Sequence, residues 1–121
     1  MHNTLGKRMK WIRENKNLKQ NKVAKDLSIT PYQLSRYETG KNKPDPDMIA
    51  KIAIYYDVSS DYLLGLTDDD APINRDEKEF LQAVSDPDLK RWYKGLPLSP
   101  EEDLKKLRKM WEIIKSDPDR D

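Results

Sequence analysis

Three polar side chains, Tyr32, Gln33 and Arg36, have types and a spacing that suit hydrogen bonds to the edges of nucleic-acid bases. Arginine matches the two acceptors of guanine, and glutamine matches the donor and acceptor of adenine. All three belong to a helix predicted at about Thr30–Thr39, in which the apolar Leu34 is expected to face inward. The outer side of this helix is therefore expected to carry groups suited to reading bases in a major groove.

Residue types that carry catalysis or bind metals are scarce in this chain. Cysteine is absent, which excludes disulfides, thiolate metal sites and cysteine nucleophiles, and His2 is the single histidine. The chain has no phosphate-binding glycine loop, and we interpret its acidic run Asp68–Asp70 as a solvated linker. We therefore expect neither an enzyme nor a bound cofactor or metal ion.

Charge is distributed unevenly along the chain. The net charge is +1, but residues 1–43 contain 11 lysines and arginines against 3 acidic residues, a net charge of +8. Residues 66–121 contain 11 against 15 and are therefore acidic. A basic first part suits double-stranded DNA, because phosphate neutralisation supplies most non-specific affinity. The alternative is that these lysines only solvate helix surfaces.

Helical periodicity and helix start signals recur throughout the sequence, whereas the alternating pattern of strands does not. In the first half, helices are predicted at about 4–16, 19–27 and 30–39, with two more starting at Asp45-Pro46 and Ser59. The second and third helices are joined by only Ser28 and Ile29, so the third must project outward at a steep angle. Ala24 is the small residue needed where these two helices come closest. The fold class is therefore all-α.

The first half resembles the phage-repressor-like, or Xre, helix-turn-helix family in the stretches LKQNKVAKDLSITPYQLSRYETGKNKPD and IAKIAIYYDVSSDYLLG. The resemblance covers roughly residues 4–66 and implies a five-helix, lambda-repressor-like DNA-binding domain at residues 1–66. It also implies a transcription regulator that binds a DNA operator as a dimer. Ser28 departs from the family, which usually has glycine in a left-handed turn there, and serine costs on the order of 1 kcal/mol.

The same resemblance assigns roles to individual residues. The base-reading positions are Pro31, Tyr32, Gln33 and Arg36, and Gln20 matches a phosphate-contacting position. Lys41, Asn42 and Lys43 are also expected to contact phosphate, because they directly follow the third helix. Arg13 and Glu38 match a structural ion pair between the first helix and the end of the third. Pro31 has no donor to offer, and a capping box could occupy the side chain of Gln33. The alternative for the phosphate-contacting set is an exposed surface without a ligand.

The second half consists of an acidic linker at residues 67–73 and a helical segment at residues 74–121. A short helix starting at Asp86-Pro87 carries Leu89, Trp92 and Tyr93, and its Trp92-Tyr93 region could pack against the last helix. The last helix starts at Ser99-Pro100, and its apolar face is formed by Leu104, Leu107, Met110, Trp111 and Ile114. Such a face needs a partner, either its own chain or another molecule. We expect it to drive oligomerisation, since the linker would let it reach a second subunit.

Two functional hypotheses follow. The first is a sequence-specific transcription regulator, a repressor that binds as a homodimer with the helix at about Thr30–Thr39 in the major groove. The second is the antitoxin of a toxin–antitoxin pair, in which the segment 74–121 binds a toxin; another protein regulator could also bind there. No stretch has the length and apolarity of a membrane span or a signal peptide, so a cytoplasmic location is expected.

Overall fold

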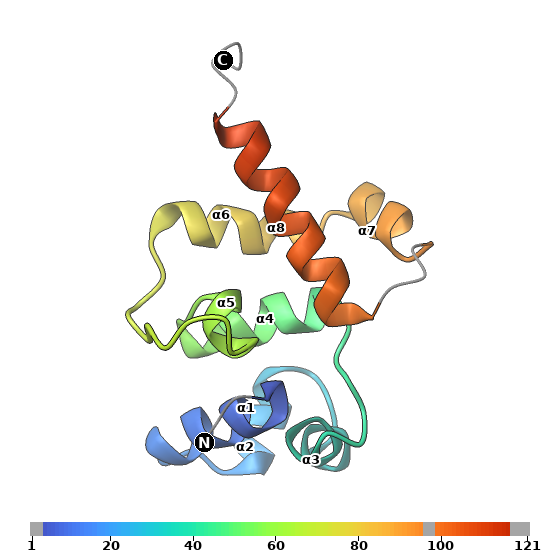
Figure 1. Ribbon diagram of the computed structural model, residues 1–121. Coiled ribbons are helices and arrows are strands. Elements are labelled where there is room, and N and C mark those ends of the chain that lie inside the picture. Colours follow the sequence, from blue (N-terminus) through green and yellow to red (C-terminus); the bar gives the residue numbers. More distant parts are fainter. Residues whose placement is uncertain (1–3, 96–98, 117–121) are drawn as a thin grey trace.

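The computed structural model describes residues 4–95 and 99–116, which form eight helices and no strand (Figure 1). The helices are α1 (Leu5–Asn15), α2 (Gln20–Asp26), α3 (Pro31–Thr39), α4 (Pro46–Tyr56), α5 (Ser60–Leu63), α6 (Arg75–Val84), α7 (Pro87–Tyr93) and α8 (Pro100–Ser116). The predicted all-α fold class is confirmed. Residues 96–98 and 117–121 of the predicted segment 74–121 lie outside the described residues. None of the helices described has the length and apolarity needed to cross a membrane.

The helices begin where side chains can accept hydrogen bonds from free backbone N–H groups. Such capping side chains precede α1 and α3 to α7, at Thr4, Thr30, Asp45, Ser59, Asn74 and Asp86. Proline follows directly in α3, α4 and α7, where its fixed φ suits the first helical position. Because these signals act locally, predicted and observed helix starts agree closely.

Several helices end where the backbone becomes left-handed. Asn17, Ser28 and Asp57, which follow α1, α2 and α4, have φ angles of 56°, 60° and 57°. Gly40 ends α3 with a φ of 80°. Glycine adopts this conformation without strain, whereas a residue with a Cβ does so at a cost. The left-handed turn that the family resemblance implies at Ser28 is therefore present.

One hydrophobic core joins the two halves of the chain. Figure 1 shows α1, α2 and α3 in one layer, α4 and α5 in the middle, and α6, α7 and α8 in the layer beyond. Helix α4 is almost fully buried at Ile49, Ile52, Ala53 and Tyr56, as expected for a helix covered on several sides. Residues of α6 and α8 belong to the same cluster, namely Phe80, Leu81, Val84, Leu104 and Leu107.

The connecting residues 67–73 are attached to the first half. Arg8 of α1 donates to the carbonyl oxygen of Thr67 at 3.0 Å and pairs with the carboxylate of Asp68 at 2.7 Å. The backbone N–H of Ile73 donates to the carboxylate of Asp57 at 3.2 Å. The expectation that this linker leaves the second half free to move is therefore corrected, because α6 and α8 cover apolar surface of α4.

A polar cluster fastens α8 to α5 and α6. Arg108 of α8 forms an ion pair with Glu77 of α6 and donates to the hydroxyl of Ser60, the first residue of α5, at 2.6 Å. The backbone N–H of Ser60 donates to the same carboxylate at 3.2 Å. The Arg108 guanidinium also lies 4.1 Å from the ring centroid of Phe80. Because each charge has partners, the cluster can be buried at this helix junction.

The short helix α7 turns one of two adjacent aromatic residues into the core. Tyr93 is only 1% exposed, and its hydroxyl donates to the carbonyl oxygen of Val84. Trp92, its neighbour in the same predicted region, is 47% exposed. Adjacent positions on a helix point about 100° apart, so a helix of this length turns only one of the two toward the core. Of these two aromatic residues, Tyr93 is therefore the one that packs into the core.

Candidate nucleic-acid interface

Helices α2 and α3 meet at a sharp corner that turns one side of α3 outward. Ala24 of α2 and Leu34 of α3 are fully buried at this junction. After the left-handed Ser28, the Thr30 side chain accepts a hydrogen bond from the backbone N–H of Gln33 at 3.1 Å and starts α3. In Figure 1, α3 lies at the edge of the molecule away from α6 and α8. The corner therefore leaves one face of α3 accessible.

The predicted base-reading residues are not equivalent on this face. Tyr32 is 71% exposed, and Pro31 is exposed beside it. Gln33 is half-buried, and its amide N–H donates to the hydroxyl of Tyr37 at 2.8 Å. Arg36 is also half-buried, but its side-chain hydrogen bonds lie at the surface, whereas that of Gln33 is partly buried. Tyr32 and Arg36 therefore supply the polar groups of the accessible face.

Only neutral side chains contact the guanidinium of Arg36. Its Nη1 donates to the Tyr32 hydroxyl at 3.3 Å, and its Nη2 donates to Oδ1 of Asn42 at 3.2 Å. The guanidinium also lies 5.6 Å from the centroid of the Tyr32 ring. The other arginines of residues 4–95 and 99–116 each form an ion pair with a carboxylate, namely Arg8, Arg13, Arg75, Arg91 and Arg108. Among the arginines described, Arg36 alone keeps a positive charge without a carboxylate partner.

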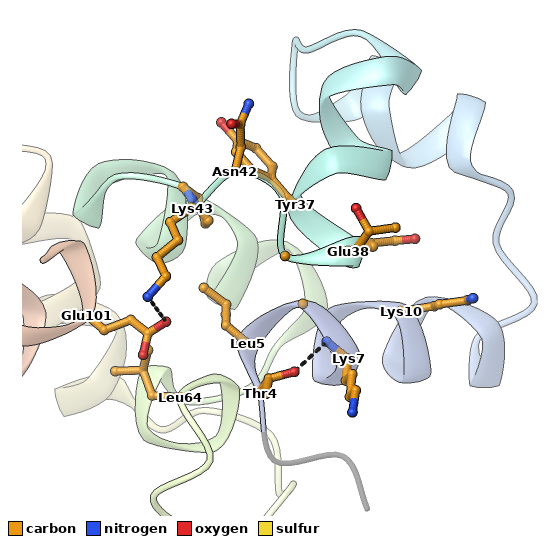
Figure 2. Close-up of a pocket in the computed structure, with 14 residues that line it drawn as sticks. Thr4, Leu5, Lys7, Lys10, Tyr37, Glu38, Asn42, Lys43, Leu64 and Glu101 are labelled. Carbon is orange, nitrogen blue, oxygen red and sulfur yellow. Dashed lines mark hydrogen bonds and ion pairs between the residues drawn. The ribbon is translucent and has the colours of Figure 1, made fainter.

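The loop after α3 lies on the same surface and carries Lys41, Asn42 and Lys43. The backbone N–H of Asn42 donates to the carbonyl oxygen of Arg36 at 3.2 Å, which holds the loop against the end of α3. Lys43 extends toward the start of α8, where its Nζ lies 3.8 Å from the carboxylate of Glu101 (Figure 2). A groove of about 700 Å³ opens between α1, the end of α3 and this ion pair. Lys43, one of the predicted phosphate-contacting residues, thus also contacts the C-terminal helix.

A buried network joins α1, α2 and α3. Arg13 donates to both carboxylate oxygens of Glu38, at 2.8 Å and 3.1 Å, and this hydrogen bonding raises the pKa of Arg13. The Gln20 amide donates to the same carboxylate at 2.9 Å, so one of its two N–H groups is already used. Gly6 permits the close approach of α1 to α3, since a Cβ there would lie 2.5 Å from the carbonyl oxygen of Tyr37. These contacts fix the position of α3.

Comparison with known proteins identifies the arrangement of α2 and α3. A family model described as a helix-turn-helix domain matches residues 6–68, more than half of the chain. The chain belongs to the helix-turn-helix family. Its matched region spans α1 to α5, and the Xre-like resemblance seen in the sequence is confirmed by the model and by relatives.

The curated relatives of this helix-turn-helix protein come from Bacillus subtilis (strain 168). The uncharacterized HTH-type transcriptional regulator YobD is 35% identical over 109 residues, 88% of this chain and 92% of that protein. The HTH-type transcriptional regulator ImmR is 34% identical over 90 residues, 70% of this chain and 71% of that protein. The SPbeta prophage-derived uncharacterized HTH-type transcriptional regulator YonR is 37% identical over 59 residues, 49% and 55% of the two chains. No solved structure matches significantly. The protein is an HTH-type transcriptional regulator.

Part of the predicted oligomerisation surface of the helix-turn-helix regulator is buried within its own chain, and part is exposed. Leu104 and Leu107 are 1% and 3% exposed and lie in the core of their own chain. They are unavailable to a second molecule, because α4 and α6 already cover that part of α8. The apolar side chains left at the surface lie further along α8, at Met110, Ile113 and Ile114, with Trp111 half-buried beside them. Ile113 was not among the predicted residues.

Three contacts of this candidate interface were missed by sequence reasoning. Tyr32 and Arg36 are four residues apart on a helix, a spacing that places side chains side by side and could have indicated their contact. The contact of Asn42 with Arg36 depends on the loop conformation, for which the sequence gives no such signal. Glu101 lies in the first turn of α8, where acidic residues are common because they interact favourably with the helix dipole. Its sequence position therefore gave no indication that it contacts Lys43.

Proposed function

We propose that this regulator binds a specific double-stranded DNA operator as a homodimer and represses transcription by occupying it. In each subunit, α3, at about Thr30–Thr39, lies in the major groove, and the residues after it bind phosphates. Because its relatives are bacterial regulators, we place its action in the cytoplasm. Metal and cofactor chemistry plays no part in this proposal.

The proposal rests on one observation, that the guanidinium of Arg36 contacts only neutral side chains. It projects from the outer side of the second helix of the helix-turn-helix unit and has no carboxylate partner, in contrast to the other arginines described. A guanidinium in such a position can bind O6 and N7 of guanine with two parallel N–H groups. Tyr32, exposed one turn earlier, can add a contact to a neighbouring base or sugar.

Lys41 and Lys43 suit the phosphate backbone beside α3. The ion pair of Lys43 with Glu101 is long and partly exposed, so a phosphate can replace the carboxylate at little cost. Gln20 retains one amide N–H for a phosphate after its hydrogen bond to Glu38. These contacts would hold the protein on DNA without selecting a sequence.

Self-association is proposed through the exposed end of α8. Met110, Ile113 and Ile114 are 37%, 68% and 49% exposed. Apolar side chains that gather at a surface in this way are typical of a protein–protein contact site. Two subunits joined there could bind two half-sites about one helical turn of DNA apart. The names of the relatives favour a transcription regulator over the antitoxin hypothesis, in which the same surface would bind a toxin.

Selection of bound sequences from random DNA duplexes tests the proposal. We expect the full chain to enrich a symmetric pair of half-sites that each contain a guanine, and to bind the selected duplex less tightly as salt rises. The selected operator placed over a promoter should lower transcription of a reporter gene. A chain that enriches no sequence, or whose affinity is independent of salt, would contradict the proposal.

A further inference from the structure

Arg36 is held in a defined orientation by two side chains from different segments. The Tyr32 hydroxyl accepts from Nη1 at 3.3 Å and the Asn42 side chain accepts from Nη2 at 3.2 Å. The ring of Tyr32 lies against the guanidinium, 5.6 Å from its carbon, which is within the range of a cation–π contact. Asn42 is itself attached to the end of α3 through its backbone N–H. The three residues therefore form one unit at the surface.

The chemistry of this unit leaves Arg36 able to bind a ligand. A guanidinium has five N–H donors and no acceptor, so Asn42 must present its amide oxygen and Tyr32 its hydroxyl oxygen. Two donors are used and three remain, enough for a two-point contact with guanine. Both partners are neutral, so the positive charge is not cancelled as it is by a carboxylate.

We propose that Tyr32 and Asn42 are positioning residues that aim Arg36 at one base pair and so set the preference for guanine there. A free arginine side chain loses much rotamer freedom on binding, whereas one that is already held loses less. This inference rests on the proposed DNA binding and gives Asn42 a role in base selection in place of the phosphate contact predicted from its position after α3.

Single-base variants of the selected operator, measured with the full chain at fixed salt, test this role. Asn42→Ala removes the amide but keeps the backbone hydrogen bond, and the backbone there does not have a positive φ. Tyr32→Phe removes only the hydroxyl. Each variant should lower the preference for guanine at the position that Arg36 reads by about 2- to 10-fold. Lys41→Ala, next to Asn42 in the exposed loop, is the matched control and should weaken all duplexes alike.

The double variant Asn42→Ala/Arg36→Ala separates positioning from a direct phosphate contact. If Asn42 acts through Arg36, its loss should have no further effect once Arg36 is absent. An additional uniform loss of affinity in that background would overturn the inference, as would an unchanged guanine preference in Asn42→Ala and Tyr32→Phe. Such a result would leave the proposed function standing if the wild type still selects a sequence. A wild type that selects no sequence would refute both.

Discussion

Arginine side chains in this molecule differ in their partners, and the partner indicates the role. Arg13 and Arg108 lie against buried carboxylates and hold helices together. Neither can exchange its partner for a DNA phosphate without leaving a buried carboxylate unpaired, which is costly. Arg36 contacts only neutral oxygens and incurs no such cost. The type of residue alone does not separate structural arginines from arginines that remain available to a ligand.

Arg13→Ala should strongly destabilise the fold. The substitution leaves the carboxylate of Glu38, which is 5% exposed, without its cation, and the free energy of unfolding should fall by about 3 kcal/mol or more. Urea denaturation measures the change. Lys22→Ala is the matched control, since its ion pair with Asp26 is at the surface of one helix and should matter little. Equal losses in the two variants would contradict this assignment.

Asp103 should make stability depend on pH. It is 6% exposed, its Oδ1 has no hydrogen-bond partner within the described residues, and burial raises the pKa of its carboxyl group. Since the pKa is higher in the folded state than in the unfolded one, the charged form lowers stability at neutral pH, and protonation relieves this as the pH falls.

Asp103→Asn should therefore raise the melting temperature at neutral pH. The gain should shrink as the pH approaches the ordinary aspartate pKa of about 4. Glu102→Gln, an exposed change in the same first turn of α8, provides the comparison and should give no such gain. A gain for Asp103→Asn that is the same at all pH values would show that charge is not the cause.

At the scale of elements, the sequence predicts helix starts well because capping residues act over a few neighbouring positions. Thr30 and Asp45 illustrate this, since each caps the helix that begins at the next residue. The sequence does not predict which side of a short helix faces the core, because packing against distant segments determines it. Trp92 and Tyr93 are both plausible core residues by sequence, and only contact with α6 determines that Tyr93 is buried.

The turn between α2 and α3 carries strain that glycine should remove. Ser28 has a φ of 60°, a conformation that costs a residue with a Cβ about 1–2 kcal/mol. Ser28→Gly should raise the free energy of unfolding by roughly 0.5–1 kcal/mol, since the relief exceeds the added entropy of the unfolded chain. Ser35→Gly in α3 adds the same entropy without relief and should destabilise. A loss of stability in Ser28→Gly would contradict the argument.

At the scale of the whole molecule, sequence reasoning found the elements but not their assembly. The acidic residues 67–73 have the composition of a flexible linker, yet Arg8 and Asp57 bind them. Leu104 and Leu107 form the apolar face that the sequence predicts, but an apolar face does not reveal which surface covers it. Here α4 of the same chain does, and the exposed remainder lies near the end of α8.

This division predicts different outcomes for two carboxylates introduced into α8. Ile113→Asp changes a residue that is 68% exposed, so the chain should stay folded while the proposed dimer weakens at least about tenfold. Leu107→Asp places the charge at a 3% exposed position and should unfold the C-terminal helices. Lys94→Asp, exposed on the surface after α7, should do neither. Sedimentation and circular dichroism measure both properties. A wild type that stays monomeric with its operator would exclude the dimer.

Lys43 contacts Glu101 of α8, so in the proposed complex with DNA the carboxylate and a DNA phosphate would compete for the same ammonium group. Such competition is reciprocal. The free energy by which the Glu101 contact weakens DNA binding should equal the free energy by which bound DNA destabilises the contact of α8 with Lys43. An exposed ion pair contributes at most about 1 kcal/mol, so this coupling can alter DNA affinity only about fivefold. The start of α8 would therefore change the affinity for a proposed operator only slightly, and it could not by itself abolish binding.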